Sequence, residues 1–449
     1  MFDDLIRRLS KPVPRYTSYP TAPHFHEGIT AQTYGDWLHD LSADSAVSLY
    51  VHIPFCDRLC WFCGCNTKQV QRYDPIAHYL RALMGEIETV GARLGDRVRV
   101  THLHLGGGSP SMLSSSDLLL LALKLRQAFV IQTDLEFSIE IDPNDMSADR
   151  YDAFAAAGIT RISVGVQDFD PKVQEAINRI QTVEQTRAVV DGMRARGVNS
   201  VNLDVLYGLP HQTEASLEGT IDAVLEMTPD RIALFGYAHV PWMKTHQRMI
   251  DEAALPDVVA RYHQSRLAAN RLIAAGYEPI GIDHFALPQD NLAVAARAGR
   301  LRRNFQGYTT DDAPALIGLG ASAIGSLPQG YVQNSVPTSD YMRRVQSGGL
   351  ATIRGVELSE DDRMRSYAIE QLMCNFEVDV AQLRQRFGEA SGVLLDDIRA
   401  LYAMDGEGLV SFDGERLAMT ERGRPFVRAI AAVFDAYLET GKQRHSVAV

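Results

Sequence analysis

The chain reads HIPFCDRLCWFCGCN from His52 to Asn66, and this run holds four of the five cysteines among its 449 residues. Cys56, Cys60 and Cys63 have the spacing CxxxCxxC, so one short loop can wrap three thiolates around a metal cluster. A fourth metal site of that cluster would then have no protein ligand. An open iron of this kind can bind a substrate.

Three other interpretations of this cysteine cluster are a disulfide pair, a structural zinc site and an electron-transfer iron–sulfur centre. Disulfide frameworks belong to small secreted domains, and the chain begins MFDDLIRRLS with no apolar signal segment. Structural zinc usually takes ligands from two separated pairs, whereas Cys374 stands alone in an apolar helical stretch, where we expect a buried core residue. A ferredoxin-type cluster needs a fourth thiolate, and Cys65 is awkwardly close to Cys63 for wrapping one cubane.

The composition predicts a large soluble enzyme, and reduced thiols without a targeting segment indicate the cytoplasm. Apolar residues make up 46% of the chain and charged residues 22%, and no uninterrupted apolar run approaches the ~20 residues that span a bilayer. The net charge of −12 argues against a broad nucleic-acid surface. We therefore expect no nucleic-acid partner and no membrane span, and any anionic substrate must meet local positive charge.

Short β-rich apolar runs alternate along the chain with longer amphipathic stretches, which is typical of βαβ units. The sequence therefore predicts an α/β fold with a parallel sheet, and six such units would make a partial (β/α)6 barrel. Polar motifs follow the runs, where βα loops gather at one mouth of a barrel. The predicted strands are 48–53, 101–105, 136–141, 161–166, 201–206 and 231–235, and predicted helices include 74–94, 115–129 and 214–227.

The two ends of the chain differ in pattern from the middle. We expect residues 1–45 to form an arm that is irregular over its first 25 residues, 46–350 to form the catalytic domain, and 351–449 to form a mainly helical, winged-helix-like domain. The last prediction rests on helical patterns at 359–373, 380–387 and 393–404 and on a hairpin signal, Asp413-Gly414, within 409–420. Because residues 355–449 carry 11 Lys and Arg against 17 Asp and Glu, we favour a wall of the active site over a DNA-binding domain.

The cysteine motif, with the aromatic Phe62 before its third cysteine, resembles the radical S-adenosylmethionine (SAM) superfamily. The longer string from Tyr50 to Asn66 is similar to that of the oxygen-independent coproporphyrinogen III oxidases. The resemblance implies a partial radical SAM barrel, and its motifs cover nearly the whole chain. These motifs are GGGSP at 106–110, IEIDP at 139–143, GVQDF at 165–169, YGLP at 207–210, YAHVP at 237–241 and RNFQGYTT at 303–310.

The resemblance also implies the cofactors, which are one [4Fe–4S] cluster held by Cys56, Cys60 and Cys63 and two SAM molecules. An electron from such a cluster cleaves SAM to methionine and a 5′-deoxyadenosyl radical, so the protein must hold its substrate close and exclude water. Family positions imply Tyr50, Gly107, Glu140 and Ile324 at the first SAM. They imply Phe62, Gly108, Ser109, Gln167, Arg179, Asp204 and Ala238 at the second.

Residue chemistry alone supports these positions only in part. Glycines 106–108 after an apolar strand permit close backbone approach, although such runs more often form plain tight turns. Glu140 at a strand end can grip ribose hydroxyls or be an ordinary ion-paired acid. Arg179 can bind a cofactor or form a surface salt bridge. Without the surrounding motifs, the ordinary interpretations would be favoured.

The substrate implied by the resemblance is coproporphyrinogen III, a tetrapyrrole with four propionates. Under anaerobic conditions two of them would lose a hydrogen and carbon dioxide to become vinyl groups, giving protoporphyrinogen IX in haem biosynthesis. Arg297, Arg300, Arg302 and Arg303 offer cationic grips, since arginine binds carboxylates bidentately, although a solvated helix face is an equal alternative for the first two. The resemblance implies Arg15, Tyr16, Arg303 and Gln306 at the substrate, and Cys65, Tyr50 and His52 as catalytic residues.

Partners and alternative functions complete the interpretation. We expect an electron donor such as flavodoxin or ferredoxin, an electron acceptor that the sequence does not identify, and a monomer. A related haem chaperone would bind haem without decarboxylation, but it usually lacks the Gly64-Cys65-Asn66 continuation. A pure electron-transfer protein would need neither a substrate domain nor the set Glu140, Gln167 and Asp204.

Overall fold

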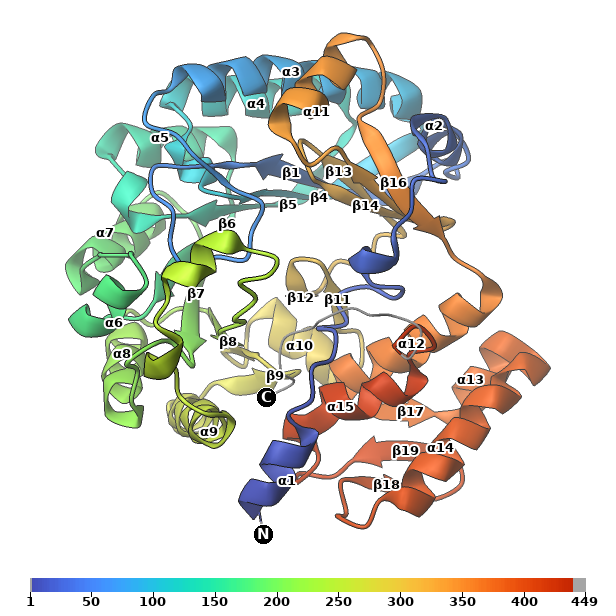
Figure 1. The fold of residues 1–449 in the computed structure, drawn as a ribbon. Helices are drawn as coiled ribbons and strands as arrows, with labels where there is room; N and C mark the ends of the chain where they lie inside the picture. The colour runs from blue at the N-terminus through green and yellow to red at the C-terminus, as the bar shows by residue number, and fades with distance from the viewer. Residues whose placement is uncertain (1, 439–449) are drawn as a thin grey trace.

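A twelve-stranded sheet frames the computed structural model, which describes residues 2–438. Its order is β16-β15-β14-β13-β1-β4-β5-β6-β7-β8-β10-β9, and the strands from β13 to β8 run parallel. This parallel part curls into an open barrel (Figure 1). Its strands are β1 (Ser45–Ile53), β4 (Val98–Gly107), β5 (Ile131–Ile141), β6 (Arg161–Gln167), β7 (Ser200–Tyr207), β8 (Arg231–Gly236) and β13 (Ala315–Leu319).

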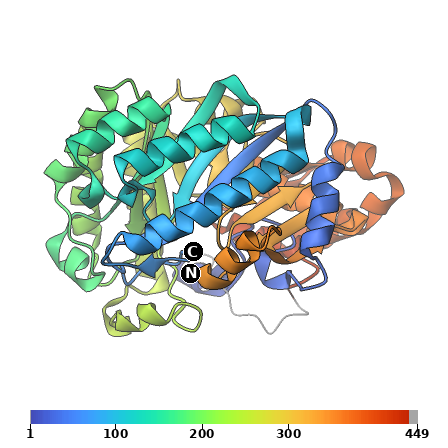
Figure 2. The same ribbon diagram turned by 90° about the horizontal axis from the view of Figure 1, so that it is seen from above.

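Helices connect the parallel strands on the outside of the barrel, and Figure 2 shows the longest of them lying along the sheet. The predicted α/β barrel and its strand–helix alternation are therefore confirmed. No helix within residues 2–438 is both long and apolar enough to cross a membrane. The connecting helices are α3 (Asp74–Leu94), α4 (Ser115–Ala128), α5 (Ala148–Ala157), α6 (Pro171–Ala176), α7 (Val183–Arg194), α8 (Glu214–Glu226) and α9 (Val258–Ala274).

Helix beginnings are set by side chains that satisfy free backbone amides. Thr182 before α7 and Thr213 before α8 each form a capping box, in which the cap accepts from the third residue of the helix and that residue's side chain accepts from the cap. Asp257 accepts from two backbone amides at the start of α9. These caps fix where each βα loop ends, and therefore which residues remain in the loops at the barrel mouth.

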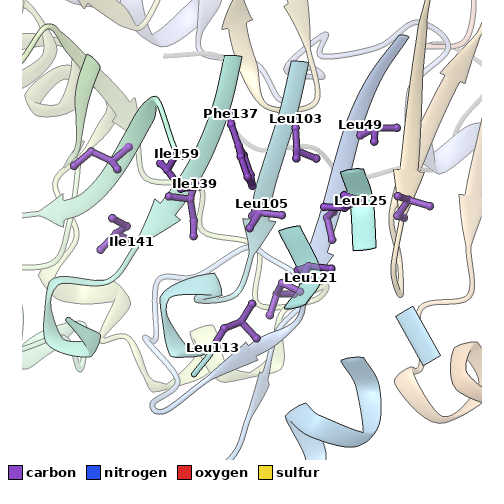
Figure 3. Packing of buried hydrophobic residues seen from close by; sticks show 14 of the residues in the cluster. Leu49, Leu103, Leu105, Leu113, Leu121, Leu125, Phe137, Ile139, Ile141 and Ile159 are labelled. Carbon is purple, nitrogen blue, oxygen red and sulfur yellow. The ribbon is translucent and has the colours of Figure 1, made fainter. Parts of the chain in front are cut away.

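The core lies between the sheet and its helices. Leu103, Leu105 and Phe137 on the parallel strands pack toward Leu121 and Leu125 of α4, and all five are almost completely buried (Figure 3). Successive strand residues point to opposite faces, so the residues between these apolar ones point into the barrel. Each buried leucine or phenylalanine contributes about 1.5–3 kcal/mol relative to an exposed one. The inner face of the strands is therefore available for polar side chains.

The sheet extends beyond the six strands that the sequence predicts. β13 adds a parallel strand beside β1, and antiparallel strands lengthen both edges. Most added strands have only three to six residues, which is too short for a clear two-residue period. The further elements are β2 (Phe55–Cys56), β3 (Lys68–Gln69), β9 (Glu278–Ile280), β10 (His284–Ala286), α10 (Asn291–Arg297), β11 (Arg302–Asn304), β12 (Gly307–Thr309), β14 (Ile324–Leu327), β15 (Gly330–Asn334), α11 (Thr338–Gln346) and β16 (Thr352–Glu357).

The C-terminal region is mainly helical and carries a small antiparallel sheet, β17-β19-β18, as the sequence predicts. Gly414 has φ +99° in the hairpin turn, a conformation that favours glycine. The domain boundaries stay a prediction, and residues 439–449 lie outside the described residues. The elements are α12 (Glu360–Asn375), β17 (Glu377–Asp379), α13 (Val380–Phe387), α14 (Gly392–Met404), β18 (Val410–Phe412), β19 (Arg416–Met419) and α15 (Val427–Ala431).

The N-terminal arm is more regular than predicted. It begins with α1 (Phe2–Leu9) and includes α2 (Ala31–His39), so the prediction of an irregular first 25 residues was wrong for residues 2–9, whereas residues 10–21 contain no helix. Leu5 and Ile6 of α1 are buried in the hydrophobic cluster of the C-terminal region, and this burial stabilises a helix too short to show periodicity. The arm then passes, in dark blue, between the barrel and the C-terminal helices (Figure 1).

Glu86 of α3 anchors the segment that follows β13. Glu86 is only 2% exposed. Its carboxylate accepts hydrogen bonds from the Gly320 amide at 2.6 Å, Asn334 Nδ2 at 2.6 Å and the Tyr341 hydroxyl at 2.7 Å. Burial raises the pKa of Glu86 to about 7, although these three donors act in the opposite direction. The folded protein therefore binds the Glu86 proton more tightly than the unfolded chain does.

We predict that Glu86 makes the free energy of unfolding fall as the pH rises from about 4.5 to about 7, with no further loss from this group above that range. The stabilising contribution is fully present below the unfolded pKa and disappears as the pH passes the folded pKa. Glu86→Gln removes this titration. Urea unfolding of both proteins at several pH values measures the difference, and a difference that does not change with pH would contradict the prediction.

Candidate active site

The clustered cysteines lie on the loop around β2 and line a cavity at the barrel mouth. Cys60 is buried, Cys56 and Cys63 are half-buried, Cys65 is exposed, and all four are free thiols. The cavity has a volume of about 220 Å³, and its wall continues onto strands β5, β6 and β7. It lies where the carboxyl ends of parallel strands meet, the usual place for a site in this architecture.

The structure brings most of the predicted cofactor-binding residues to this one cavity. Those that line it are Phe62, Gly107, Gly108, Ser109, Glu140, Gln167, Arg179 and Asp204, together with the four cysteines. Tyr50, His52, Ala238 and Ile324 do not line it. Tyr50 and His52 lie on β1 beside it, with the Tyr50 hydroxyl 2.9 Å from His52 Nδ1.

The glycine run permits a close approach of backbone segments. A Cβ atom on Gly108 would lie 2.6 Å from the Phe55 carbonyl oxygen, and one on Gly107, which has φ +117°, would lie 2.5 Å from the His52 ring. A larger residue at either position would push the cysteine loop or β1 away. The interpretation as a close-approach segment is therefore favoured over a plain tight turn.

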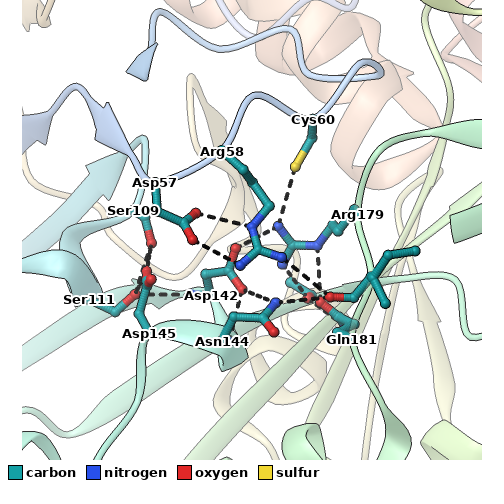
Figure 4. Close-up of polar contacts among 12 residues, drawn as sticks. Asp57, Arg58, Cys60, Ser109, Ser111, Asp142, Asn144, Asp145, Arg179 and Gln181 are labelled. Atoms are coloured by element: carbon teal, nitrogen blue, oxygen red, sulfur yellow. Dashed lines mark hydrogen bonds and ion pairs between the residues drawn. The ribbon is translucent and has the colours of Figure 1, made fainter. Parts of the chain in front are cut away.

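Arg179 is buried beneath the cysteine loop (Figure 4). Its Nη1 donates to Asp142 Oδ2 at 2.9 Å and lies 3.7 Å from Cys60 Sγ, while Nη2 donates to the Gly165 carbonyl at 2.8 Å and Nε to Gln181 Oε1 at 3.0 Å. Burial alone would lower the pKa of Arg179, but Asp142 raises it, so the guanidinium stays charged. The alternative of a surface salt bridge was wrong, because the pair is internal.

Glu140 and Asp204, two of the three carboxylates that line the cavity, have opposite pKa shifts. Burial by itself would raise the pKa of Glu140, but His104 Nε2 at 3.3 Å and the Gly107 amide at 2.9 Å from the carboxylate hold it below its usual value. Burial raises the pKa of Asp204 to about 6, although the Ser163 hydroxyl donates to it at 2.9 Å. Glu140 is therefore an ionised acceptor for hydroxyl or amino groups, not a solvated surface acid.

A second cavity of about 190 Å³ fills the barrel interior and adjoins the first. Glu140, Ser163 and Asp204 line both cavities. Gln306 lies on the wall of the interior cavity, as does Tyr308. A molecule bound inside the barrel would therefore touch the same carboxylates as one bound at the cysteines.

The other predicted substrate residues are placed less uniformly. Tyr16 is buried, its hydroxyl donates to Asp435 at 3.0 Å, and the residue lines a neighbouring cavity. Arg15 and Arg303 line a further cavity outside β8. Arg297 is exposed and pairs with Glu278 at 2.6 Å, which supports the alternative of a solvated helix face.

Three side chains donate hydrogen bonds to main-chain carbonyls of the cysteine loop. The sequence gave no reason to select them. They lie on the segment after β8 and contact carbonyls roughly 180 residues earlier, so no spacing motif links the two. Gln247 also bonds the carbonyl of Ala238 at 3.2 Å, which places this predicted residue next to the loop. The contacts are Lys244 Nζ to the Cys65 carbonyl at 3.0 Å, His246 Nε2 to the Cys63 carbonyl at 2.7 Å and Gln247 Nε2 to the Phe62 carbonyl at 2.9 Å.

The arrangement of the thiols bears on the kind of metal centre. Within residues 2–438, no group of three or more His, Cys, Asp or Glu side chains is placed to hold a single metal ion. This gives no support to the zinc alternative. A cluster of several irons separates its thiolate ligands more widely than one ion does, so the assignment of Cys56, Cys60 and Cys63 as cluster ligands stays a prediction.

Comparison with known proteins agrees with this geometry. Residues 50–224 match the radical SAM superfamily and residues 358–426 match the HemN C-terminal domain. The chain is 49% identical to the oxygen-independent coproporphyrinogen III oxidase of Bradyrhizobium diazoefficiens, with 97% of each chain covered, and 45% identical to that of Paracoccus denitrificans, with 97% and 96% covered. The solved coproporphyrinogen III oxidase (HemN) of Escherichia coli, described as a radical SAM enzyme, is 39% identical, covers 94% of this chain and 98% of its own, and superposes with a TM-score of 0.90.

The structure has an open parallel barrel with a CxxxCxxC loop at its mouth, and it superposes on a radical SAM enzyme over nearly its whole length. The protein is therefore a radical SAM enzyme. Such enzymes use a [4Fe–4S] cluster and SAM. Within this class, the chain belongs to the family of oxygen-independent coproporphyrinogen III oxidases.

We predict that Arg179→Met lowers the free energy of unfolding by about 3–5 kcal/mol, because Asp142 would remain buried without its positive partner. The matched control is Arg187→Met on α7, where Arg187 pairs with Glu226 at the surface and the expected loss is below about 1 kcal/mol. Denaturant unfolding of the three proteins measures both values. Equal losses in the two variants would contradict an important role for the buried pair.

Proposed function

We propose that this protein oxidises coproporphyrinogen III without oxygen, converting two of its propionates to vinyl groups with loss of carbon dioxide and giving protoporphyrinogen IX. The observation that carries the proposal is that the cysteine-lined cavity and the barrel interior share Glu140, Ser163 and Asp204. A cofactor at the cysteines and a propionate reaching into the barrel would therefore meet. The names of the full-length relatives support the same reaction.

The donor set at the cavity fits an iron–sulfur cluster. Cys56, Cys60 and Cys63 would hold it with three free thiols, and Arg179 beside Cys60 opposes the effect of burial, which raises the pKa of that thiol. When bound, the cluster supplies the electron that cleaves SAM and so generates the radical that abstracts hydrogen from a propionate. Residues proposed for the two SAM molecules line the same cavity in most cases, which supports adjacent binding.

The protein's own residues orient the reactants and control protons. Burial lowers the pKa of His52, so its ring is neutral, with one nitrogen donating and the other accepting. Because His52 Nε2 lies 3.0 Å from the Asn66 carbonyl, it is the donor, and Nδ1 accepts from the Tyr50 hydroxyl. These two hydrogen bonds link Tyr50 through His52 to the cysteine loop. Ionised Glu140 provides an acceptor whose position is held by the Gly107 amide.

Cys65 has a different role from the other three cysteines in this proposal. Its backbone amide donates to Cys63 Sγ at 3.4 Å, so it lies next to the ligand set without extending it. Its side chain lines the cavity and is available as a catalytic donor. The proposal also includes a monomer, a reductant such as flavodoxin or ferredoxin, and a separate acceptor for the electron released by decarboxylation.

Cysteine substitutions are expected to separate ligands from the catalytic residue. Cys56→Ser, Cys60→Ser and Cys63→Ser should each abolish cluster assembly, whereas Cys65→Ser should keep the cluster and lose turnover. Cys374→Ala, in a buried cluster distant in sequence, should keep both. Iron and sulfide counts with electron paramagnetic resonance measure the cluster. Loss of the cluster in Cys65→Ser together with its retention in one of the first three would refute the assignment.

The reaction itself is tested with the reconstituted protein under anaerobic conditions, with SAM, a reductant, an electron acceptor and coproporphyrinogen III. We expect vinyl product and 5′-deoxyadenosine to appear together in mass spectrometry. Formation of deoxyadenosine without decarboxylation would mean that the radical chemistry acts on another tetrapyrrole. Neither product, combined with tight haem binding, would support the haem-chaperone alternative instead.

A further inference from the structure

A third cavity, of about 220 Å³, lies on the outer side of β8, against α9 and the C-terminal region. Six arginines line it but only two carboxylates, those of Asp283 and Glu421. This excess of positive charge contrasts with the net charge of −12 for the whole chain. We call this cavity the arginine pocket, and its arginines are Arg15, Arg261, Arg266, Arg303, Arg424 and Arg428.

Two of these arginines have buried nitrogen atoms without hydrogen-bond partners among residues 2–438. The Arg303 side chain is 4% exposed, and its Nε and Nη1 are unpartnered, while Nη2 lies 3.8 Å from Asp283 Oδ2. Arg261 donates through Nη1 to the Tyr237 carbonyl at 2.8 Å, but its Nε is unpartnered. Buried polar groups without partners are rare in folded proteins and cost free energy. These nitrogens have almost no accessible surface, so an acceptor in the pocket reaches them only when the side chains shift toward it.

The guanidinium groups also repel one another. Burial, and after it the neighbouring charges of Arg15 and Arg303, lower the pKa of Arg428 to about 9. Arg428 itself is held by donation to the carbonyls of Val13 at 2.8 Å and Pro14 at 3.3 Å, so it cannot turn away. A bound anion would reduce this repulsion in a region of low dielectric.

The pocket adjoins the interior of the barrel. Phe235 of β8 lines both the arginine pocket and the interior cavity. The Arg303 guanidinium lies over the ring of Tyr308, 4.5 Å from its centre, and Tyr308 lines the interior cavity. An anionic group in the arginine pocket can therefore belong to a molecule whose remainder extends toward the barrel.

We propose that the arginine pocket binds a carboxylate of the substrate, namely a propionate other than the one reacting at the cysteine-lined cavity. This inference rests on the proposed function, which supplies a tetrapyrrole with four propionates. Guanidinium groups bind carboxylates through paired, charge-assisted hydrogen bonds, and six guanidinium groups line this one pocket. The pocket gives an otherwise acidic protein a local site for a polyanion.

Binding of coproporphyrin III, the fluorescent oxidised form of the substrate, to the reconstituted holoenzyme tests the pocket. We expect Arg261→Gln to raise the Kd about tenfold, because one charge-assisted contact is lost. The matched control is Arg271→Gln on the same helix, where Arg271 pairs with Asp222 outside the pocket and the Kd should not change. The uncharged tetramethyl ester of coproporphyrin III should bind all three proteins alike.

A second variant guards against a folding defect. Arg266 is an exposed residue on the rim of the pocket, so Arg266→Gln should leave the fold and iron content unchanged and still raise the Kd. An unchanged Kd for coproporphyrin III in both Arg261→Gln and Arg266→Gln would overturn the inference. The inference would also be overturned if the two variants lost only the binding of inorganic phosphate, because the pocket would then bind a small anion and not the substrate carboxylate.

Turnover of coproporphyrinogen III by the unmodified protein separates this inference from the proposed function. Vinyl product combined with unchanged coproporphyrin binding in the variants overturns the pocket alone. Absence of vinyl product combined with weakened binding in Arg261→Gln overturns the function and keeps the pocket as a carboxylate site.

Discussion

The two-residue period of the parallel strands is the constraint on which the rest of the structure depends. On β4, Leu103 and Leu105 pack outward toward the helices, so His104 must point into the barrel, where it meets Glu140 of β5. The apolar face stabilises the sheet, and the same alternation forces polar groups into an enclosed space. Burial then raises the pKa of Asp204, while hydrogen bonds hold the pKa of Glu140 below its usual value. Stability and site chemistry therefore have one origin.

Charge placement completes the site. The internal pair of Arg179 and Asp142 joins the cysteine loop to β5 and β6, and it puts a permanent positive charge beside Cys60. Farther out, the arginine pocket concentrates positive charge within a chain whose net charge is −12. Arg179 is fixed by Asp142 and a backbone carbonyl, and Arg428 by two backbone carbonyls. The protein thus offers rigid electrostatic features to two chemically different ligands, a cofactor and a polyanion.

The sequence predicted the parts of the molecule that carry a repeated pattern. Predicted strands such as 136–141 and 161–166 alternate apolar with polar or small residues, 231–235 is a short apolar run, and the periodic helices α3 and α13 match their predicted bounds. The short edge strands and α1 were not predicted, because two buried residues such as Leu5 and Ile6 are too few to form a periodic pattern. The cysteine motif predicted the cavity, but Lys244 and Gln247 could not be predicted, because they bind main-chain carbonyls that any sequence possesses. Family resemblance, not residue chemistry, supplied Tyr50, Ala238 and Ile324.

The main-chain grip on the cysteine loop has a consequence for how the protein matures. Lys244, His246 and Gln247 engage carbonyl oxygens, so they shape the loop without occupying the cysteine sulfurs. Many small metal-binding domains acquire their fold only when the metal arrives. Here the hydrogen bonds from these three side chains already offset part of the ordering entropy of the loop. Cluster assembly therefore has a smaller share of that entropy left to offset.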